Sequence, residues 1–120
     1  MNIINNTLFL EDISVETLMQ EYGSPLYVYE ESVLRSQFRQ LSSGFPEGLL
    51  EIHYSMKANS NPSLLKILRE EGSSIDAVSE FEVRLALESG FEPQQIIFTG
   101  NNNTLAEIEY WVEQEVSVNL

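Results

Sequence analysis

The chain has 120 residues, of which 42% are hydrophobic and 10% aromatic, so it can bury one core of single-domain size. Nineteen acidic residues against six basic ones give a formal net charge of −13, which argues against binding to nucleic acid or to an anionic membrane surface. The absence of cysteine excludes disulfides, thiolate catalysis and cysteine-based metal sites, and no other pattern indicates a metal site. Without a basic leader or a membrane-length apolar run, we expect a soluble, cytoplasmic protein.

The N-terminal residues 1–24 are expected to form a lead-in and a short helix. Asp12 or Ser14 is suited to be the N-cap of this helix, and Gly23 to end it. The segment Pro25–Glu30 follows, and its aromatic and β-branched residues are typical of a strand. We therefore predict a helix and then a strand in this part of the chain.

A second helix is predicted after this strand. Ser32 can act as its N-cap, and the apolar residues Leu34, Phe38 and Leu41 recur at the spacing of one helix face. Residues 43–46 contain serine, glycine and proline, which end helices. An amphipathic helix that stops near Ser43 is the result that we expect.

From Glu51 onward, the pattern predicts a regular alternation of strands and helices. The strands are expected to start near Glu51, Ser74, Ile96 and Val116. The helices between them are expected to start at Asn61 and Pro62, at Ser79 and at Thr104. Capping boxes are indicated at two of these starts, Ser79 to Glu82 and Thr104 to Glu107. Helix-ending glycines stand at Gly72 and Gly90.

Parallel strands joined by helical crossovers form either an open doubly wound sheet or a (β/α)8 barrel. A complete barrel takes about 250 residues, so this chain can hold about half of one. The chain is thus either part of a barrel or a small self-contained α/β domain.

The segment Glu51–Pro62 contains a lysine at a place that suggests chemistry. Alternation along a strand would put Glu51, His53, Ser55 and Lys57 on one face and Ile52, Tyr54, Met56 and Ala58 on the other. Active sites of barrels and of open α/β sheets lie at the carboxyl ends of strands, where Lys57 is expected. A lysine in a desolvated interior is a usable amine nucleophile for a carbonyl group. The alternative is a surface lysine, and spacing alone does not separate the two.

Four segments in order resemble the fold-type III pyridoxal-phosphate-dependent decarboxylases, which include the diaminopimelate, ornithine and arginine decarboxylases and are distantly related to alanine racemase. These segments are SPLYVYEE, YSMKANSNP, SSIDAVSEFEVRLALESGF and QQIIFTGNNNT. The segments PLYVY, KANSNP and IIFTGNN are most similar in sequence to those of the diaminopimelate decarboxylases. The resemblance implies the N-terminal half of an alanine-racemase-like (β/α)8 barrel, with parallel strands alternating with helices.

The resemblance also implies roles for individual residues. Lys57 would hold pyridoxal 5'-phosphate as a Schiff base, and the cofactor ring would act as the electron sink for loss of an α-carboxylate. Asp76 matches the family aspartate beside the cofactor, and its alternative is a solvated turn acid. Ser79 and Glu82 also match family positions, although a capping box explains both. His53 shares the face of Lys57 and is either a satisfied interior group or a proton carrier.

The implied activity is that of a carboxy-lyase acting on a small amino acid, most closely the conversion of meso-2,6-diaminopimelate to L-lysine and CO2 in lysine biosynthesis. An ornithine- or arginine-type decarboxylase and a non-catalytic cofactor-binding relative are the alternatives. Four residues depart from the family pattern: Glu80 and Phe81, where glycines are usual, Asn103, where lysine is common, and Glu115, where glycine is usual. These departures bear on the substrate more than on the cofactor.

By the same resemblance, residues 25–120 would be a partial pyridoxal-phosphate-binding barrel domain. The phosphate loop, the ring-stacking histidine, the acid at the pyridine nitrogen and a C-terminal β-domain would lie beyond Leu120. The full-length protein would be a homodimer, and the chain alone would be inactive.

Overall fold

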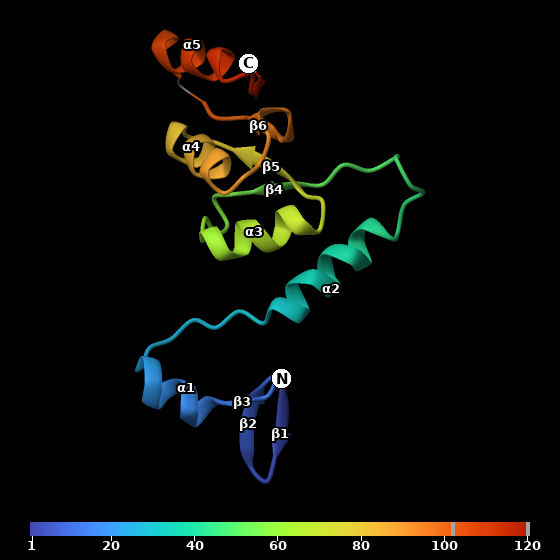
Figure 1. Cartoon of the computed structure of the whole chain (residues 1–120), viewed down its shortest axis with the longest axis vertical. Helices are drawn as coiled ribbons and strands as arrows, with labels where there is room; N and C mark the ends of the chain where they lie inside the picture. Colours follow the sequence, from blue (N-terminus) through green and yellow to red (C-terminus); the bar gives the residue numbers. More distant parts are fainter. Residues whose placement is uncertain (102, 120) are drawn as a thin grey trace. The chain divides into compact units, whose positions relative to one another are not determined.

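The structure is a computed structural model that describes residues 1–101 and 103–119. It divides into two compact units, Met1–Leu34 and Arg35–Leu120 (Figure 1). The first unit contains β1 (Asn2–Ile4), β2 (Thr7–Leu10), β3 (Ile13–Ser14), α1 (Val15–Tyr22) and the start of α2 (Glu31–Ser42). The second contains the rest of α2, then β4 (His53–Ser55), α3 (Pro62–Glu70), β5 (Ser74–Ala77), α4 (Glu80–Glu88), a 3-10 turn (Pro93–Gln95), β6 (Ile96–Phe98), α5 (Leu105–Glu113) and β7 (Ser117–Val118).

In the N-terminal unit, a small antiparallel sheet of β1, β2 and β3 leads into α1. Asn5 and Asn6 form the turn between β1 and β2 with positive φ angles of 51° and 64°, as the tight turns of hairpins require. The predicted helix is confirmed, with Ser14 as its N-cap and Gly23 at its end at a φ of 81°. The Ser14 hydroxyl accepts a hydrogen bond from the N–H of Thr17 at 3.1 Å. The lead-in therefore forms strands that its sequence pattern did not predict.

The strand predicted over Pro25–Glu30 is wrong. This segment is irregular in the structure, and its first five residues are exposed. Aromatic and β-branched residues favour a strand only where a neighbouring strand offers a ladder and a packed face. Within the described residues, Pro25–Glu30 has neither.

The helix α2 begins at Glu31, two residues earlier than an N-cap at Ser32 would give, so Ser32 lies in its first turn and is not the N-cap. The carbonyl of Glu30 accepts from the N–H groups of Val33 and Leu34, both at 3.1 Å, and this starts the helix. The N–H of Ser32 donates to a carboxylate oxygen of Glu11 at 3.4 Å. The helix ends at Ser42, as the following serine, glycine and proline predicted.

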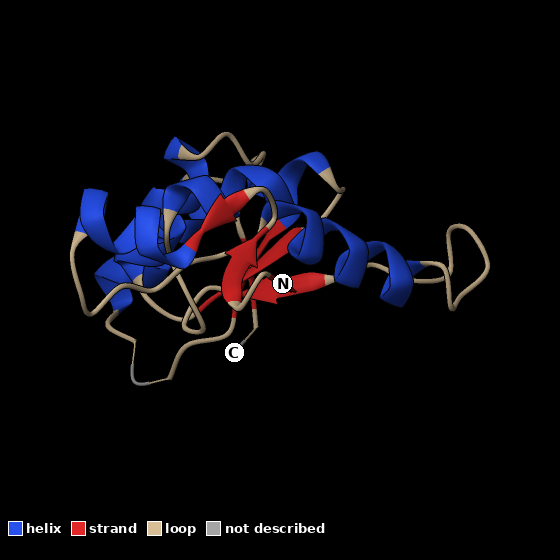
Figure 2. Ribbon diagram, turned by 90° about the horizontal axis from the view of Figure 1, so that it is seen from below, coloured by secondary structure: helices blue, strands red, loops and turns tan. Residues whose placement is uncertain are grey.

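In the second unit, the strands are parallel and follow the order β4-β5-β6-β7, as predicted. Strands and helices alternate from β4 onward (Figure 1), and Figure 2 shows the helices in blue and the strands in red. The predicted helix starts are confirmed, with Asn61, Ser79 and Thr104 as the N-caps of α3, α4 and α5. The capping box of Thr104 and Glu107 is complete.

At the start of α4, only half of the predicted capping box forms. The N–H of Glu82 donates to the Ser79 hydroxyl at 3.2 Å. The Glu82 carboxylate does not return to Ser79 but accepts from the N–H of Val78 at 2.7 Å. It therefore ties the helix to the residue that follows β5.

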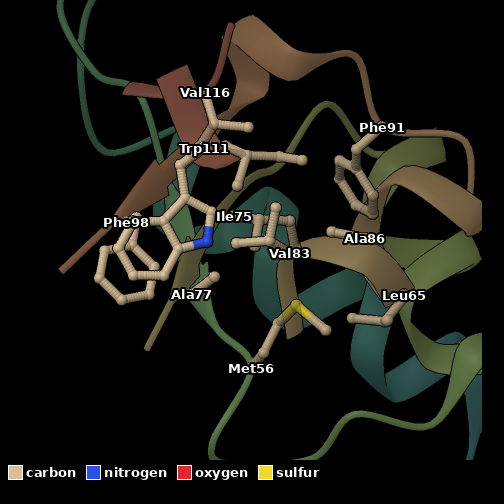
Figure 3. Close-up of a cluster of buried hydrophobic side chains, with 11 residues drawn as sticks. Met56, Leu65, Ile75, Ala77, Val83, Ala86, Phe91, Phe98, Trp111 and Val116 are labelled. Atoms are coloured by element: carbon tan, nitrogen blue, oxygen red, sulfur yellow. The ribbon is translucent and has the colours of Figure 1, made fainter. Parts of the chain in front are cut away.

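The hydrophobic core lies on one face of the parallel sheet (Figure 3). The strand residues of this core are Ile75, Ala77, Ile96 and Phe98, and the helices α3, α4 and α5 add Leu65, Val83, Ala86 and Trp111. The rings of Phe98 and Trp111 stack with their centroids 3.6 Å apart. Ile75 pairs with Ile96 and Ala77 pairs with Phe98, so all four side chains lie on the same face of the sheet. The three helices that pack against them therefore cover that one face. This arrangement is that of a barrel wall, whereas a doubly wound sheet has helices on both faces.

An ion-pair network joins Arg35 and Arg39 of α2 to the end of α3. Glu71 accepts from the Nε of Arg39 at 2.5 Å and from the Nη1 of Arg35 at 2.8 Å, and Arg35 also pairs with Glu70 at 2.6 Å. The hydrogen bonds from Arg39 and Arg35 lower the pKa of Glu71 from 4.5 to about 2.

In the part of the chain that the structure describes, no helix is both long and apolar enough to cross a bilayer.

Replacing Leu65 by alanine tests the core. Leu65 is fully buried, so its truncation should lower the free energy of unfolding by about 2–5 kcal/mol. Urea denaturation measures this loss. The matched control is Leu105→Ala, since Leu105 is 71% exposed and should change stability by less than about 0.5 kcal/mol. Equal losses in both variants would contradict the position of the core.

The network around Glu71 predicts a pH dependence of stability. Because folding lowers the pKa of Glu71, its contribution is present above pH 4.5 and should be lost as the pH falls from about 5 towards 2. Urea midpoints of wild type and Glu71→Gln should therefore differ at pH 6 and converge near pH 2. The control Glu113→Gln changes an exposed carboxylate of α5 and should run parallel to wild type. A constant gap between wild type and Glu71→Gln at all pH values would refute the assignment.

Candidate functional site

Lys57 lies in the turn that follows β4, at the carboxyl end of the parallel sheet. The N–H of Ala58 donates to the carbonyl of Ser55 at 3.1 Å, which closes this turn. The N–H of Met56 donates to the carbonyl of Asp76 at 3.1 Å and ties the turn to β5. Met56 is buried in the core, whereas Lys57 is exposed. The described residues thus place Lys57 at the predicted edge but do not enclose it.

Asp76 lies on the neighbouring strand β5 and is half-buried. It is the register partner of Ser55, two residues before Lys57. The hydroxyl of Thr99 donates to Oδ1 of Asp76 at 2.5 Å, and the N–H of Thr99 donates to the carbonyl of Ala77 at 2.9 Å. The structure therefore brings Lys57, Asp76 and Thr99 to the same end of three adjacent strands.

Thr99 is a site residue that the sequence reasoning missed. It directly follows β6, in which Ile96 and Phe98 face the core. Alternation puts Thr99 with Ile97 on the opposite face, which is also the face of Asp76. The predicted strand start at Ile96 already contained this signal.

Ser55 adds an unsatisfied polar atom to the same face. Its hydroxyl is buried, and it has no hydrogen-bond partner among the described residues. Buried polar groups are normally paired, so an unpaired one marks a place where a ligand or water would be favoured. Ser55 lies in register with Asp76, so this atom belongs to the candidate site.

His53 has partners at the amino ends of the strands. Its Nε2 lies 3.3 Å from Oε1 of Glu51, and its Nδ1 lies 3.4 Å from the carbonyl of Ile75. The same oxygen of Glu51 accepts from the hydroxyl of Ser74 at 2.7 Å. His53 is exposed, so the interior position expected for it is wrong, although its ring nitrogens have these polar partners.

Ser79 and Glu82 have structural contacts. Their hydrogen bonds start α4 directly after β5, and Glu82 is 9% exposed. The strand end that carries Asp76 is thereby joined to a helix N-terminus. Neither residue needs a catalytic role to explain its position.

Gly100 follows Thr99 and permits a close approach of the backbone. A Cβ atom at this position would lie 2.6 Å from the carbonyl oxygen of Val78 and would also overlap the ring of Phe98. The side chain of Asn103 donates to the carbonyl of Gly100 at 2.9 Å. Asn102, which belongs to the family-like turn, lies outside the described residues.

Comparison with known proteins identifies the family. Residues 31–120 match the family described as "Pyridoxal-dependent decarboxylase, pyridoxal binding domain". The chain belongs to this family. The resemblance drawn from the motifs is thus confirmed, and so is the barrel fold that it implied.

Relatives of this family cover nearly the whole chain. A diaminopimelate decarboxylase of Methanothermobacter thermautotrophicus is 41% identical over 105 residues, which are 86% of this chain and 24% of that protein. A crystal structure from Aquifex aeolicus has a TM-score of 0.91 at 35% identity, covering 99% of this chain and 30% of that one. A Helicobacter pylori diaminopimelate decarboxylase complexed with L-lysine has a TM-score of 0.79 at 31% identity, covering 88% and 27%. The chain spans about a quarter of the length of these curated relatives.

Pyridoxal phosphate is the cofactor of the family, as the sequence resemblance implied. Its aldehyde requires an accessible amine, which Lys57 provides, and its polar ring substituents suit the carboxylate and hydroxyls of Asp76, Thr99 and Ser55. The chain offers less to the phosphate of the cofactor. No basic residue follows Arg84, so the ends of β6 and β7 have no cation to pair with it. The chain fits the aldehyde and ring of the cofactor better than its phosphate.

Among the described residues, no cluster of histidine and acidic side chains could hold a metal ion.

The contact between Thr99 and Asp76 predicts the effect of removing one hydroxyl. Thr99→Val keeps the shape of the side chain but leaves Oδ1 of Asp76 without its donor, so unfolding free energy should fall by about 1–3 kcal/mol. Thr99→Ser keeps the hydroxyl and should lose less than about 1 kcal/mol. Urea denaturation at pH 7 measures both variants. If valine were tolerated as well as serine, the hydrogen bond would not stabilise the edge.

Proposed function

We propose that this chain is the lysine-bearing part of a pyridoxal-phosphate-dependent amino-acid decarboxylase. The single observation that carries the proposal is the position of Lys57 in the turn after β4, with Asp76 on the next strand. The substrate that we propose for the full-length protein is meso-2,6-diaminopimelate, which is converted to L-lysine and CO2. Relatives described as diaminopimelate decarboxylases, one of them in complex with L-lysine, support this choice.

Lys57 would hold the cofactor through Nζ and so fix it at the carboxyl end of β4. When bound, the pyridoxal ring supplies the electron sink for departure of the substrate α-carboxylate. The carboxylate of Asp76 lies on the strand next to Lys57. The Thr99 hydroxyl donates to its Oδ1, and its Oδ2 is left to accept a hydrogen bond from a polar group of the cofactor. Ser55 offers a further hydroxyl that the described residues leave unpaired.

In the proposed full-length protein, segments outside this chain bind the phosphate and recognise the substrate. Residues 25–120 form the partial barrel domain, while phosphate binding and substrate recognition belong to the rest of the barrel and to a C-terminal β-domain. We further propose a homodimer that acts in the cytoplasm, a reducing compartment with which a chain without cysteine is compatible. The chain alone should not decarboxylate amino acids.

Trapping of the cofactor tests the role of Lys57. Incubation of the chain with pyridoxal phosphate, borohydride reduction and peptide mass mapping should place the pyridoxyl group mainly on Lys57. Lys66, the other lysine, is exposed on α3 and serves as the internal reference. Lys57→Ala should remove most of the label, whereas Lys66→Ala should leave it.

Activity of the full-length protein provides the second measurement. Release of CO2 from meso-2,6-diaminopimelate should be lost in Lys57→Ala and retained in Lys66→Ala. Label found mainly on Lys66, or undiminished CO2 release from Lys57→Ala, would refute the proposed function. Release from ornithine or arginine in place of diaminopimelate would keep the chemistry and reject the substrate.

A further inference from the structure

Tyr54 lies on β4, the strand that precedes Lys57, and contacts both the core and the backbone of the following turn. Its ring is partly buried and packs against the hydrophobic core. Its hydroxyl donates to the backbone carbonyl of Asn59 at 3.0 Å. Since Asn59 lies five residues further along the chain, this hydrogen bond spans the turn that contains Lys57.

The turn is thereby held at both ends. At its start, Met56 is tied to β5 by a backbone hydrogen bond to Asp76 and by burial of its side chain. At its end, Asn59 is held by Tyr54. The side chain of Asn59 accepts from the N–H of Asn61 at 2.9 Å, and Asn61 in turn caps α3.

Lys57 is exposed, and its amine lies at the end of a flexible side chain of four methylene groups. The backbone of the turn is therefore what determines where its amine can reach. A reacting group that is held in position loses less conformational freedom when it reacts, which raises its rate. The anchors around Lys57 restrict its backbone in this way.

We propose that Tyr54 is a positioning residue for Lys57, acting through its hydrogen bond to Asn59. This inference rests on the proposed function, because it assumes that Lys57 binds the cofactor. Tyr54 touches neither cofactor nor substrate in this role. Its ring serves the core and its hydroxyl serves the turn, so the two tasks can be separated by Tyr54→Phe.

The experiment compares wild type, Tyr54→Phe and the matched control Tyr27→Phe, in which an 88% exposed tyrosine loses the same hydroxyl. Two quantities are measured on the whole chain under native conditions: amide hydrogen exchange at Ala58 without cofactor, and the ratio of Lys57 to Lys66 labelling by pyridoxal phosphate and borohydride. In Tyr54→Phe, exchange at Ala58 should be about 3- to 10-fold faster and the labelling ratio about 3- to 10-fold lower, as expected for loss of one hydrogen bond. Tyr27→Phe should leave both unchanged.

A second variant approaches the same anchor from its other side. Asn59→Ala keeps the backbone carbonyl that accepts from Tyr54 but removes the side-chain acceptor of the Asn61 N–H. It therefore loosens the same end of the turn and should change both quantities in the same direction, which tests the anchor even if Tyr54→Phe does not fold. Faster exchange with an unchanged labelling ratio would reduce Tyr54 to a structural residue and overturn the inference. An unchanged exchange rate would overturn it too.

The wild-type ratio reports separately on the proposed function. If Lys57 and Lys66 of the native wild-type chain were labelled in the same ratio as in urea, Lys57 would have no special reactivity. The proposed function would then fail, and the role of Tyr54 would fail with it. A raised wild-type ratio that survives in Tyr54→Phe would reject only the role of Tyr54.

Discussion

The arrangement of the second unit depends on one constraint, which is that its helices cover only one face of a parallel sheet. Along each strand, every second residue must then be apolar to pack under the helices, as Ile75 and Ile96 do. The residues between them are free of that requirement and can be polar. Asp76 and Thr99 occupy this second set, and the polar row leads to Lys57 at the carboxyl end. The site is therefore a consequence of the same alternation that builds the core.

Much of this unit could be predicted because its signals are local. Asn61 followed by proline, and Thr104 followed by Glu107, satisfy the first backbone groups of their helices within a few residues. The strands between them were predicted from short apolar runs that end at such caps. The position of Lys57 follows from these boundaries alone. The chemical role that we propose for Lys57 does not follow from them and rests on the likeness to a known family.

The errors and omissions have a common origin in contacts between residues that are distant in the sequence. A strand is stable only beside another strand, so the composition of Pro25–Glu30 could not show that no partner is present among the described residues. The hydroxyl of Thr99 meets Asp76 across 23 positions of sequence. The Glu82 carboxylate had two backbone N–H groups within reach, and only the path of the chain after β5 selects that of Val78. Local pattern names the candidates, and the tertiary fold selects among them.

Positioning and desolvation of the lysine are separate problems in this protein. The position is determined by neighbouring contacts, those of Met56 with β5 and of Tyr54 with Asn59, and all of them lie within the described unit. Desolvation needs surfaces that close over the edge of the sheet, and Lys57 is exposed. A net charge of −13 also repels a phosphate dianion at long range. If Lys57 holds pyridoxal phosphate as proposed, the affinity of this chain for the cofactor comes chiefly from that covalent bond, because the ends of β6 and β7 offer no cation to the phosphate.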